Sequence, residues 1–562
     1  MLTTKYSHDM DINCPHSYYP RPQFKRESFL CLNGSWELGY TDTLELTEDI
    51  SYDRRITVPF PHESLLSGIG SAVPEGKILA YRREVEIPEG FIRARTFLHF
   101  GAVDQICRVY VNGALKGENE GGYLPFSVDI TEEARLGKFS VAVLVKDELD
   151  TDYTYGKQTK KRGGMWYTTI SGIWQTVWIE SLPEKYIEGI KIEPHSEGVR
   201  LTVRGGERDK LLCLESGEKF SFSGDTADIR PGTLRPWSPE DPYLYSFTLE
   251  SGEDIIESYF AIRTLDIRPH GEYNRIFLNG KPIIMNGLLD QGYYPDGLFL
   301  PATEEGYLDD IKLAKSLGYN MLRKHIKIEP MIFYHLCDRE GILVLQDMVN
   351  NGRYSFLRDT ALPTVGMQRI GDSLLNRGKK AREIFIDQMK RTAEHLFNTP
   401  SVVYYTVFNE GWGQFRADDA YRIIKEVDPT RIIDSTSGWF RQRLSDVDSR
   451  HVYFKKLKAK SRSGAPLVIS EFGGYSHRVE GHLFGSKNYG YRTYTDRDEF
   501  CKALTELYEN EVIPMKDLGA SVFVYTQLSD VEDETNGILT YDRKVIKIKP
   551  EEFKDIAEKV KI

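Results

Sequence analysis

The pattern of apolar and polar positions changes twice along the chain and divides it into three parts. In the last part, from residue 277 onward, short apolar runs alternate with segments whose apolar residues recur every three or four positions. This alternation is typical of parallel strands connected by helices. The expected strands are 319–323, 342–345, 402–408, 431–434, 466–470 and 521–525, and the expected helices are 303–317, 330–341, 381–397, one ending near 427, and 550–562.

Repeated strand-and-helix units over residues 269–562 predict a (β/α)₈ barrel, a fold that usually takes about 250 residues. A doubly wound open sheet is the alternative. It is disfavoured because no glycine-rich dinucleotide-binding motif follows any of the expected strands.

Residues 1–183 have a different pattern, with short alternating segments separated by turns and without helical spacing. Asn112-Gly113 is the strongest hairpin signal among those turns. Regularly spaced strands of this kind predict a β-sandwich or jelly roll. The clearest strands are expected at 81–87, 95–100, 108–111, 139–145 and 174–180.

The middle part, residues 184–268, again predicts strands, including 190–192, 200–203 and 244–249. The proline-rich stretch 234–245 cannot form a helix or a central strand. We expect a small second sandwich that packs the first part against the third, and we assign it no chemistry.

Two of the expected barrel strands end in carboxylates. The apolar run 402–408 stops at Asn409 and Glu410, and the run 466–470 leads directly into Glu471. Counted along the chain, these are the fourth and seventh strands. In a barrel the carboxyl ends of the strands carry the active site, so the two glutamates are expected to face each other across its mouth.

A pair of carboxyl groups at one site suits the cleavage of a glycosidic bond. One is protonated and assists the leaving oxygen, while the other is ionised and attacks the anomeric carbon. A retaining enzyme holds the two groups about 5–5.5 Å apart, and an inverting enzyme holds them about 6.5–9.5 Å apart.

Several segments of the first two parts also match a known family. They are Ile56–Phe60, Ala80–Arg83, Trp166-Tyr167, Ser171–Trp178, Leu234–Tyr245 and Ser258–Arg263. Together with the two glutamates they resemble glycoside hydrolase family 2, which contains β-galactosidases, β-glucuronidases and β-mannosidases. The resemblance implies a jelly-roll sugar-binding domain over 1–183, an immunoglobulin-like sandwich over 184–268 and a catalytic barrel over 269–562.

The same resemblance assigns roles to particular residues. Glu410, in the Asn-Glu pair after the fourth strand, corresponds to the family's acid/base, and Glu471 corresponds to its nucleophile. Asn409 is placed to bond the sugar 2-hydroxyl. His451-Val452-Tyr453 is similar to the family's His-x-Tyr segment, so we expect Tyr453 to bond the nucleophile.

Four further residues are expected to bind substrate. Asp290 follows the first barrel strand, and Arg323 resembles the arginine of the family's second strand. Trp439 and Tyr525 could stack on a sugar ring, although aromatic side chains near a barrel rim are often core residues.

The chain departs from the family pattern at a motif that binds the substrate. β-Glucuronidases carry an Asn-x-Lys that pairs with the substrate carboxylate, but here the nearest stretch is Asn536-Gly537-Ile538. We therefore expect a retaining exo-β-glycosidase of the β-galactosidase type. A uronic acid substrate, bound through Lys324 or Arg353, or a β-mannoside is the alternative, and a catalytically silent carbohydrate-binding protein is the remote one.

The composition of the chain narrows the classes of molecule that it could bind. The net charge of −11 disfavours nucleic acid and anionic membranes, and no apolar run is long enough for a bilayer span. The polar first 26 residues lack the apolar core of a secretory signal, so a cytoplasmic location is expected. The six cysteines are separated in sequence and predict neither disulfides nor a zinc site. We expect no cofactor, no metal ion, a small glycoside as the partner, and a homo-oligomer by resemblance.

Overall fold

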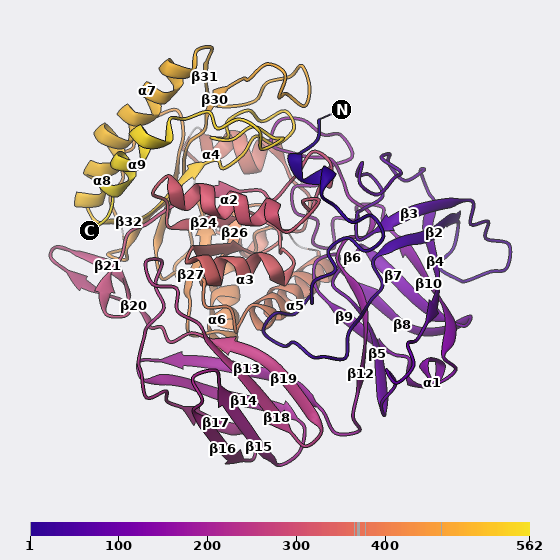
Figure 1. The fold of residues 1–562 in the computed structure, drawn as a ribbon. Helices are drawn as coiled ribbons and strands as arrows, with labels where there is room; N and C mark the ends of the chain where they lie inside the picture. The colour runs from indigo at the N-terminus through magenta and orange to yellow at the C-terminus, as the bar shows by residue number, and fades with distance from the viewer. Residues whose placement is uncertain (1, 365, 368–370, 377, 462) are drawn as a thin grey trace.

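The computed structural model describes residues 2–364, 366–367, 371–376, 378–461 and 463–562. Its strands form two antiparallel sandwiches and one parallel barrel, and Figure 1 shows the sandwiches packed beside and below the barrel. The multidomain architecture predicted from the apolar pattern is confirmed. We propose 1–183, 184–268 and 269–562 as the domain limits, which the grouping of the sheets supports.

The first sandwich consists of a four-stranded sheet (β1-β12-β5-β9), a six-stranded sheet (β3-β2-β4-β10-β7-β8) and a two-stranded sheet (β11-β6). Alternate residues such as Trp36, Leu98 and Val143 are fully buried between them. Asn112 and Gly113 both have positive φ (49° and 82°) and connect β7 to β8, so the predicted hairpin is confirmed. The elements are η1 (Lys5–His8), β1 (Leu30–Cys31), β2 (Gly34–Thr41), β3 (Arg54–Val58), β4 (Ile78–Glu86), β5 (Arg95–Phe100), β6 (Val103–Asp104), β7 (Ile106–Val111), β8 (Ala114–Glu120), β9 (Phe126–Asp129), α1 (Thr131–Ala134), β10 (Lys138–Lys146), β11 (Gly172–Ile173) and β12 (Val177–Leu182).

The second sandwich has a three-stranded sheet (β13-β14-β17) and a four-stranded sheet (β16-β15-β18-β19). The proline-rich stretch lies outside the strands as far as residue 244, with Tyr245 beginning β18, and its Trp237 is fully buried against the barrel. The elements are β13 (Ile187–His195), β14 (Gly198–Gly205), β15 (Asp209–Leu214), β16 (Lys219–Ser223), β17 (Thr226–Ile229), β18 (Tyr245–Ser251) and β19 (Asp254–Phe260).

The last part is a barrel of eight parallel strands in the order β27-β26-β25-β24-β23-β32-β29-β28. Helices cover its outside, and a cluster of buried apolar residues fills the space between strands and helices. The elements are β20 (Leu265–His270), β21 (Tyr273–Leu278), β22 (Lys281–Pro282), β23 (Met285–Asp290), α2 (Glu305–Ser316), β24 (Met321–Lys324), α3 (Met331–Glu340), β25 (Leu343–Asp347), η2 (Phe356–Ala361), α4 (Leu362–Thr364), η3 (Asp372–Leu374), α5 (Lys379–His395), β26 (Val402–Asn409), α6 (Ala417–Val427), β27 (Ile432–Ser437), β28 (Asp448–Val452), β29 (Leu467–Gly473), β30 (Tyr475–His477), β31 (Arg492–Tyr494), α7 (Arg497–Leu507), η4 (Tyr508–Val512), α8 (Ile513–Asp517), β32 (Ala520–Thr526) and α9 (Pro550–Glu558).

The predicted strand count is confirmed, since β26 and β29 are the fourth and seventh barrel strands. Strand β29 extends three residues past the expected end, so Glu471 lies within the strand and not after it. Strand β28 was not located from the sequence, because its residues Asp448–Val452 are mostly polar and give no apolar run.

Side chains close the barrel where its two end strands meet. Among the described residues, no strand ladder joins β27 to β28. Instead, His451 Nε2 lies 2.9 Å from Ser437 Oγ, and Ser437 Oγ lies 3.4 Å from Ser449 Oγ. This seam places His451 directly at the mouth.

Two observations bear on the setting of the protein. No helix among the described residues is both long and apolar enough to cross a membrane. The six cysteines are free thiols, but Cys14 and Cys31 are not isolated from each other. A hydrogen bond from the Cys31 thiol lowers the pKa of Cys14 to about 7.

Candidate active site

The backbone at Glu410 is held in an unusual conformation. All eight residues of β26 are buried, and the strand ends at Asn409. Glu410 then adopts a φ of 52°, in the left-handed region that non-glycine residues rarely occupy. Its N–H donates to the carbonyl oxygen of Ser437 on β27 at 2.9 Å. Such strained residues cluster at functional sites, where the surrounding structure stabilises them.

Glu471 is buried in a cationic environment. Arg323 Nη1 donates to its Oε1 at 3.0 Å, and the Tyr453 hydroxyl donates to its Oε2 at 2.6 Å. Burial raises the pKa of Glu471, but the charges of His451 and Arg323 and the Tyr453 hydrogen bond outweigh burial and lower the pKa well below its usual range. A carboxylate held ionised in this way is suited to act as a nucleophile.

His451 contacts both carboxyl groups. Its Nδ1 lies 2.7 Å from Glu410 Oε1 and 3.6 Å from Glu471 Oε2. When neutral His451 carries its proton on Nε2, next to Ser437, its Nδ1 can accept the proton of a protonated Glu410. When His451 is charged, Nδ1 donates to an ionised Glu410. The imidazole can therefore hydrogen-bond Glu410 in both the protonated and the ionised state that an acid/base cycle requires.

The two carboxyl groups are close together. One oxygen of Glu410, one oxygen of Glu471 and one His451 nitrogen all lie within 4.8 Å of one another. A closest approach of this size fits the roughly 5–5.5 Å separation of a retaining pair better than the roughly 6.5–9.5 Å of an inverting pair.

Three such side chains could also surround a metal ion. However, the guanidinium of Arg323 already donates to Glu471 at 3.0 Å. A second cation at the same carboxylate would be repelled by this charge. The arrangement therefore fits acid/base and nucleophilic roles better than metal binding.

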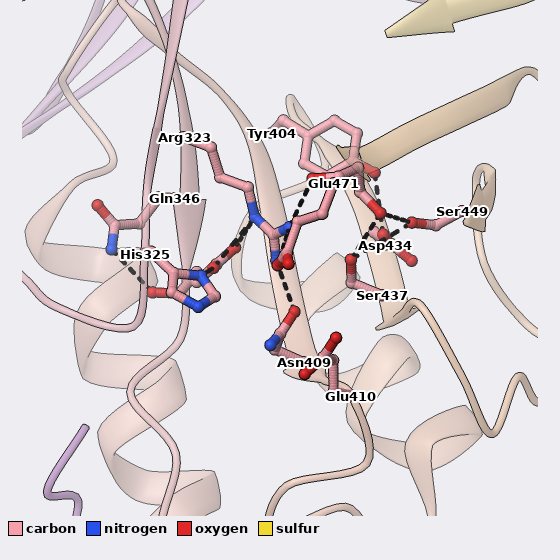
Figure 2. A network of polar contacts seen from close by, with 12 residues as sticks. Arg323, His325, Gln346, Tyr404, Asn409, Glu410, Asp434, Ser437, Ser449 and Glu471 are labelled. Atoms are coloured by element: carbon pink, nitrogen blue, oxygen red, sulfur yellow. Dashed lines mark hydrogen bonds and ion pairs between the residues drawn. The ribbon is translucent and has the colours of Figure 1, made fainter. Parts of the chain in front are cut away.

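Arg323 connects four barrel strands, and Figure 2 shows its guanidinium next to Glu471 and Asn409. Its side chain is fully buried and donates to Asp347 on β25, Asn409 on β26 and Glu471 on β29 at 2.8–3.1 Å. Arg323 thus positions the nucleophile, whereas the sequence suggested direct substrate binding.

Asn409 is placed as expected beside Glu410. Its Oδ1 accepts from Arg323 Nη2 at 2.8 Å, which fixes the orientation of the amide. The amide Nδ2 has no hydrogen-bond partner among the described residues. It is the donor that a sugar hydroxyl could use.

Asp290 belongs to a separate ion cluster. Its Oδ2 accepts from Lys324 Nζ at 2.6 Å, and Lys324 also donates to Glu329 at 2.8 Å. Lys324 is fully buried by these partners. The expectation that Lys324 could bind a uronate is therefore wrong, because its charge is already neutralised. Asp290 is buried as well, and its carboxylate bonds Lys324 and makes no hydrogen bond to Glu410 or Glu471.

The two aromatic candidates differ. Trp439 is half-buried, and its ring centroid lies 5.4 Å from that of His451, so it borders the site. Tyr525 is fully buried, with its ring 5.8 Å from that of Phe472 in the core between strands and helices. Its expected role in stacking on a sugar is contradicted by this placement.

Sequence reasoning gave no role to several residues that the fold brings to the site. Tyr491 stacks on Tyr453 with ring centroids 3.9 Å apart. His325 bonds Asp347 at 2.6 Å. Lys157 reaches the barrel from the first sandwich, and its Nζ lies 5.6 Å from the Trp412 ring. His325 was expected near the mouth, because it follows the second barrel strand two residues after Arg323, but it was given no role. Tyr491 and Lys157 are separated from the catalytic motifs in sequence and carried no signal.

A strained glutamate and an ionised glutamate at the mouth of a (β/α)₈ barrel define the site of a glycosidase-type barrel protein. The model of the glycosyl hydrolases family 2 sugar binding domain matches residues 47–183, and that of the family's TIM barrel domain matches residues 272–561. The barrel match alone covers more than half of the chain. The chain belongs to glycoside hydrolase family 2.

Individual relatives are more distant. A β-galactosidase of Thermoanaerobacter pseudethanolicus is 24% identical over 445 residues, which are 73% of this chain and 54% of the relative. A β-galactosidase of Aeromonas hydrophila is 26% identical over 452 residues, which are 74% of this chain and 41% of the relative. The chain thus spans about half the length of the curated relatives it matches.

Solved structures match over nearly their whole length. A β-glucuronidase of an uncultured Clostridium superposes with a TM-score of 0.73 at 18% identity and covers 96% of this chain and 99% of that one. A β-galacturonidase of Eisenbergiella tayi, bound to galacturonate, has a TM-score of 0.69 at 19% identity with the same coverage. At these identities the likeness establishes the fold.

Proposed function

We propose that this protein is a retaining exo-β-glycosidase that hydrolyses terminal β-linked sugars through a covalent glycosyl-enzyme intermediate. The observation that carries the proposal is the pair Glu410 and Glu471, whose nearest oxygens lie within 4.8 Å at the carboxyl ends of facing strands. Family membership supports the same reaction.

In the first step, Glu471 attacks the anomeric carbon and forms a glycosyl ester while Glu410 gives its proton to the leaving glycosidic oxygen. In the second step, Glu410 takes a proton from water, the water oxygen attacks the anomeric carbon, and the bond to Glu471 breaks. Tyr453 and Arg323 stabilise the ionised Glu471 before attack and after release, since each donates a hydrogen bond to it. Asn409 Nδ2 binds the sugar 2-hydroxyl.

Two classes of glycone are supported by different observations. The two relatives found by sequence similarity are named β-galactosidases, and they favour a β-galactoside as the substrate. This is also the substrate class predicted from the sequence. The solved structures that match over the whole chain are named β-glucuronidases and β-galacturonidases, and they favour a β-linked uronic acid.

The cellular setting belongs to the same proposal. We propose a cytoplasmic location, which six free cysteines support, because disulfides are rare in reducing compartments. We also propose a homo-oligomer. Light scattering at micromolar concentration measures the mass of the protein in solution and tests this proposal. A mass of 64.6 kDa, which is that of one chain, would contradict it.

A panel of chromogenic β-galactoside, β-glucuronide, β-galacturonide and β-mannoside substrates tests the reaction class. At least one should be turned over, and proton NMR of the fresh product should show the β-anomer first. Turnover of none of these glycosides, or release of the α-anomer, would contradict the proposal.

A further inference from the structure

A loop of the first sandwich forms part of the mouth of the barrel. This loop connects β10 to β11 and spans residues 147–171. Its Tyr155 N–H donates to the Asn350 carbonyl oxygen at 3.1 Å, and its Thr168 N–H donates to Glu532 Oε1 at 2.8 Å. The Tyr167 hydroxyl donates to Glu534. These contacts fix the loop on the barrel.

Lys157 of this loop is a lysine without a bonded partner, and most of its side chain is buried. Its exposed fraction is 7%, and its Nζ makes no hydrogen bond or ion pair with any described residue. The other buried lysines all bond oxygen atoms: Lys324 and Lys327 with Glu329, Lys547 with Asp530, and Lys210 with two carbonyl groups. The Lys157 Nζ is not one of the fully enclosed polar atoms that lack a partner, so its ammonium group remains accessible to solvent and to a ligand.

Aromatic rings hold the ammonium group in place. Its Nζ lies 5.5 Å from the centroid of Tyr167 and 5.6 Å from that of Trp412. Cation–π contacts of this kind stabilise a cation but leave its hydrogen-bond donors unused. The three N–H donors of Lys157 are therefore available to an anion.

The ammonium group lies next to the catalytic residues. Trp412, which it contacts, follows Glu410 by two residues, and the backbone N–H of Trp412 donates to the Asn409 carbonyl oxygen at 2.9 Å. The Trp412 ring also lies 6.5 Å from that of His325, which bonds Asp347 in the Arg323 network. Lys157 thus borders the site where the non-reducing sugar must bind if Glu410 and Glu471 act on it.

The neighbouring carboxylate does not satisfy Lys157. Glu534 is close enough for its charge to interact with the lysine. However, Glu534 Oε2 already accepts hydrogen bonds from Tyr167 and from Gln527 Nε2, the latter at 3.0 Å. No described residue therefore bonds Lys157 Nζ.

We infer that Lys157, supplied by the first sandwich, binds the carboxylate of the sugar, and that the glycone is therefore a uronic acid. This inference rests on the proposed glycosidase function and decides between its two glycone classes. It gives the chain a carboxylate-binding lysine that its barrel lacks where β-glucuronidases carry Asn-x-Lys, since Asn536-Gly537-Ile538 has none.

The test compares Lys157→Met, Lys157→Arg and the matched control Lys161→Met, an exposed lysine of the same loop. The kcat/KM of each is measured on β-galacturonide, β-glucuronide, neutral β-galactoside and 6-phospho-β-galactoside. The ratio of uronide to neutral kcat/KM should fall about 100-fold in Lys157→Met, mainly through KM, because a buried charge pair loses one partner. Lys157→Arg should restore most of the ratio, and Lys161→Met should leave it unchanged.

Preference of the wild-type protein for the neutral β-galactoside, or an unchanged ratio in Lys157→Met, would overturn the inference. Faster turnover of the 6-phosphate than of both uronides would overturn the assignment of a carboxylate.

Calorimetric titration of the wild-type protein with free galacturonate, glucuronate and galactose gives a second readout that does not depend on the variants folding. Tighter binding of a uronate supports the inference, and equal binding contradicts it. If uronate binds but no glycoside is cleaved, the reaction proposal fails while anion recognition stands.

Discussion

At the scale of single residues, the site separates two glutamates by their surroundings. Glu471 accepts hydrogen bonds from a guanidinium and a phenol, whereas Glu410 faces an imidazole that can either donate or accept. The sequence predicted both glutamates, because each follows an apolar strand. It could not predict that His451 lies between them or that Lys157 is unpaired, because these facts depend on contacts between distant segments.

The different surroundings predict different losses on substitution. Glu471→Gln should reduce kcat by at least about a thousandfold on every substrate, an increase of ~4 kcal/mol in activation free energy, because no nucleophile remains. Glu410→Gln should lose about 10²–10⁴-fold on substrates with poor leaving groups and much less on activated ones, which need no acid. The exposed Glu383→Gln on α5 is the control. Equal losses for Glu410→Gln on both kinds of substrate would contradict its role as the acid.

Tyr453→Phe should change the pH profile. Glu471 must be ionised to attack, and the Tyr453 hydrogen bond is among the causes that lower its pKa. Removing the hydroxyl should raise that pKa, so the acidic limb of kcat/KM should move to higher pH by about one unit, given ~1.5–3 kcal/mol for a hydrogen bond to a charged group. Tyr110→Phe, in the first sandwich, should leave the profile unchanged. An acidic limb that stays in place would show that Tyr453 does not act on the nucleophile.

At the scale of elements, the strand order of the barrel brings the chemistry together. The apolar runs of β26 and β29 made both strands predictable, and their ranks in the barrel followed from counting. Strand β28 was not predicted, because Asp448 and Arg450 interrupt any apolar pattern and its residues bond each other and the neighbouring strands. The sequence placed Tyr525 correctly on the last strand, but it could not show that the ring points toward the helices.

Arg323 joins these elements and should be irreplaceable by lysine. Its guanidinium donates to Asp347, Asn409, Glu471 and the Ser470 carbonyl oxygen. A lysine cannot reproduce this planar set of donors, so buried carboxylates would lose partners. Arg323→Lys should cost about 3–5 kcal/mol of stability, the range for breaking a buried ion pair. Chemical unfolding measures this, with the exposed Arg422→Lys of α6 expected to cost less than about 0.5 kcal/mol. Similar stabilities of the two variants would contradict the role of Arg323.

At the scale of the whole molecule, the two sandwiches and the barrel depend on one another. Arg26 connects Glu180 of the first sandwich to Asp254 of the second, at 3.3 Å and 2.8 Å. The 147–171 loop then carries Lys157 from the first sandwich to the barrel. The sequence predicted three parts but could not reveal these junctions, because they join residues far apart in the chain.

Glu180 should make stability depend on pH. Burial raises its pKa, but Arg21, His99 and Arg26 outweigh burial and lower it from 4.5 to about 2. A carboxyl group with a lowered folded pKa contributes stability above its unfolded pKa, and this contribution is lost as pH falls from about 4.5 toward 2. Glu180→Gln should therefore lower the unfolding temperature at pH 7 and flatten its decline between these pH values. The exposed Glu118→Gln is the control; a decline as steep in Glu180→Gln as in the wild type would contradict this account.

The proposed mechanism requires that Glu471 forms a covalent bond to the sugar. The most direct measurement uses a 2-deoxy-2-fluoro β-glycoside with an activated leaving group, which slows the second step and lets the intermediate accumulate. Mass spectrometry of peptides should find one sugar attached to the peptide that contains Glu471, and none after Glu471→Gln. Attachment to any other residue, or turnover by way of an inverted product with no adduct, would contradict the account.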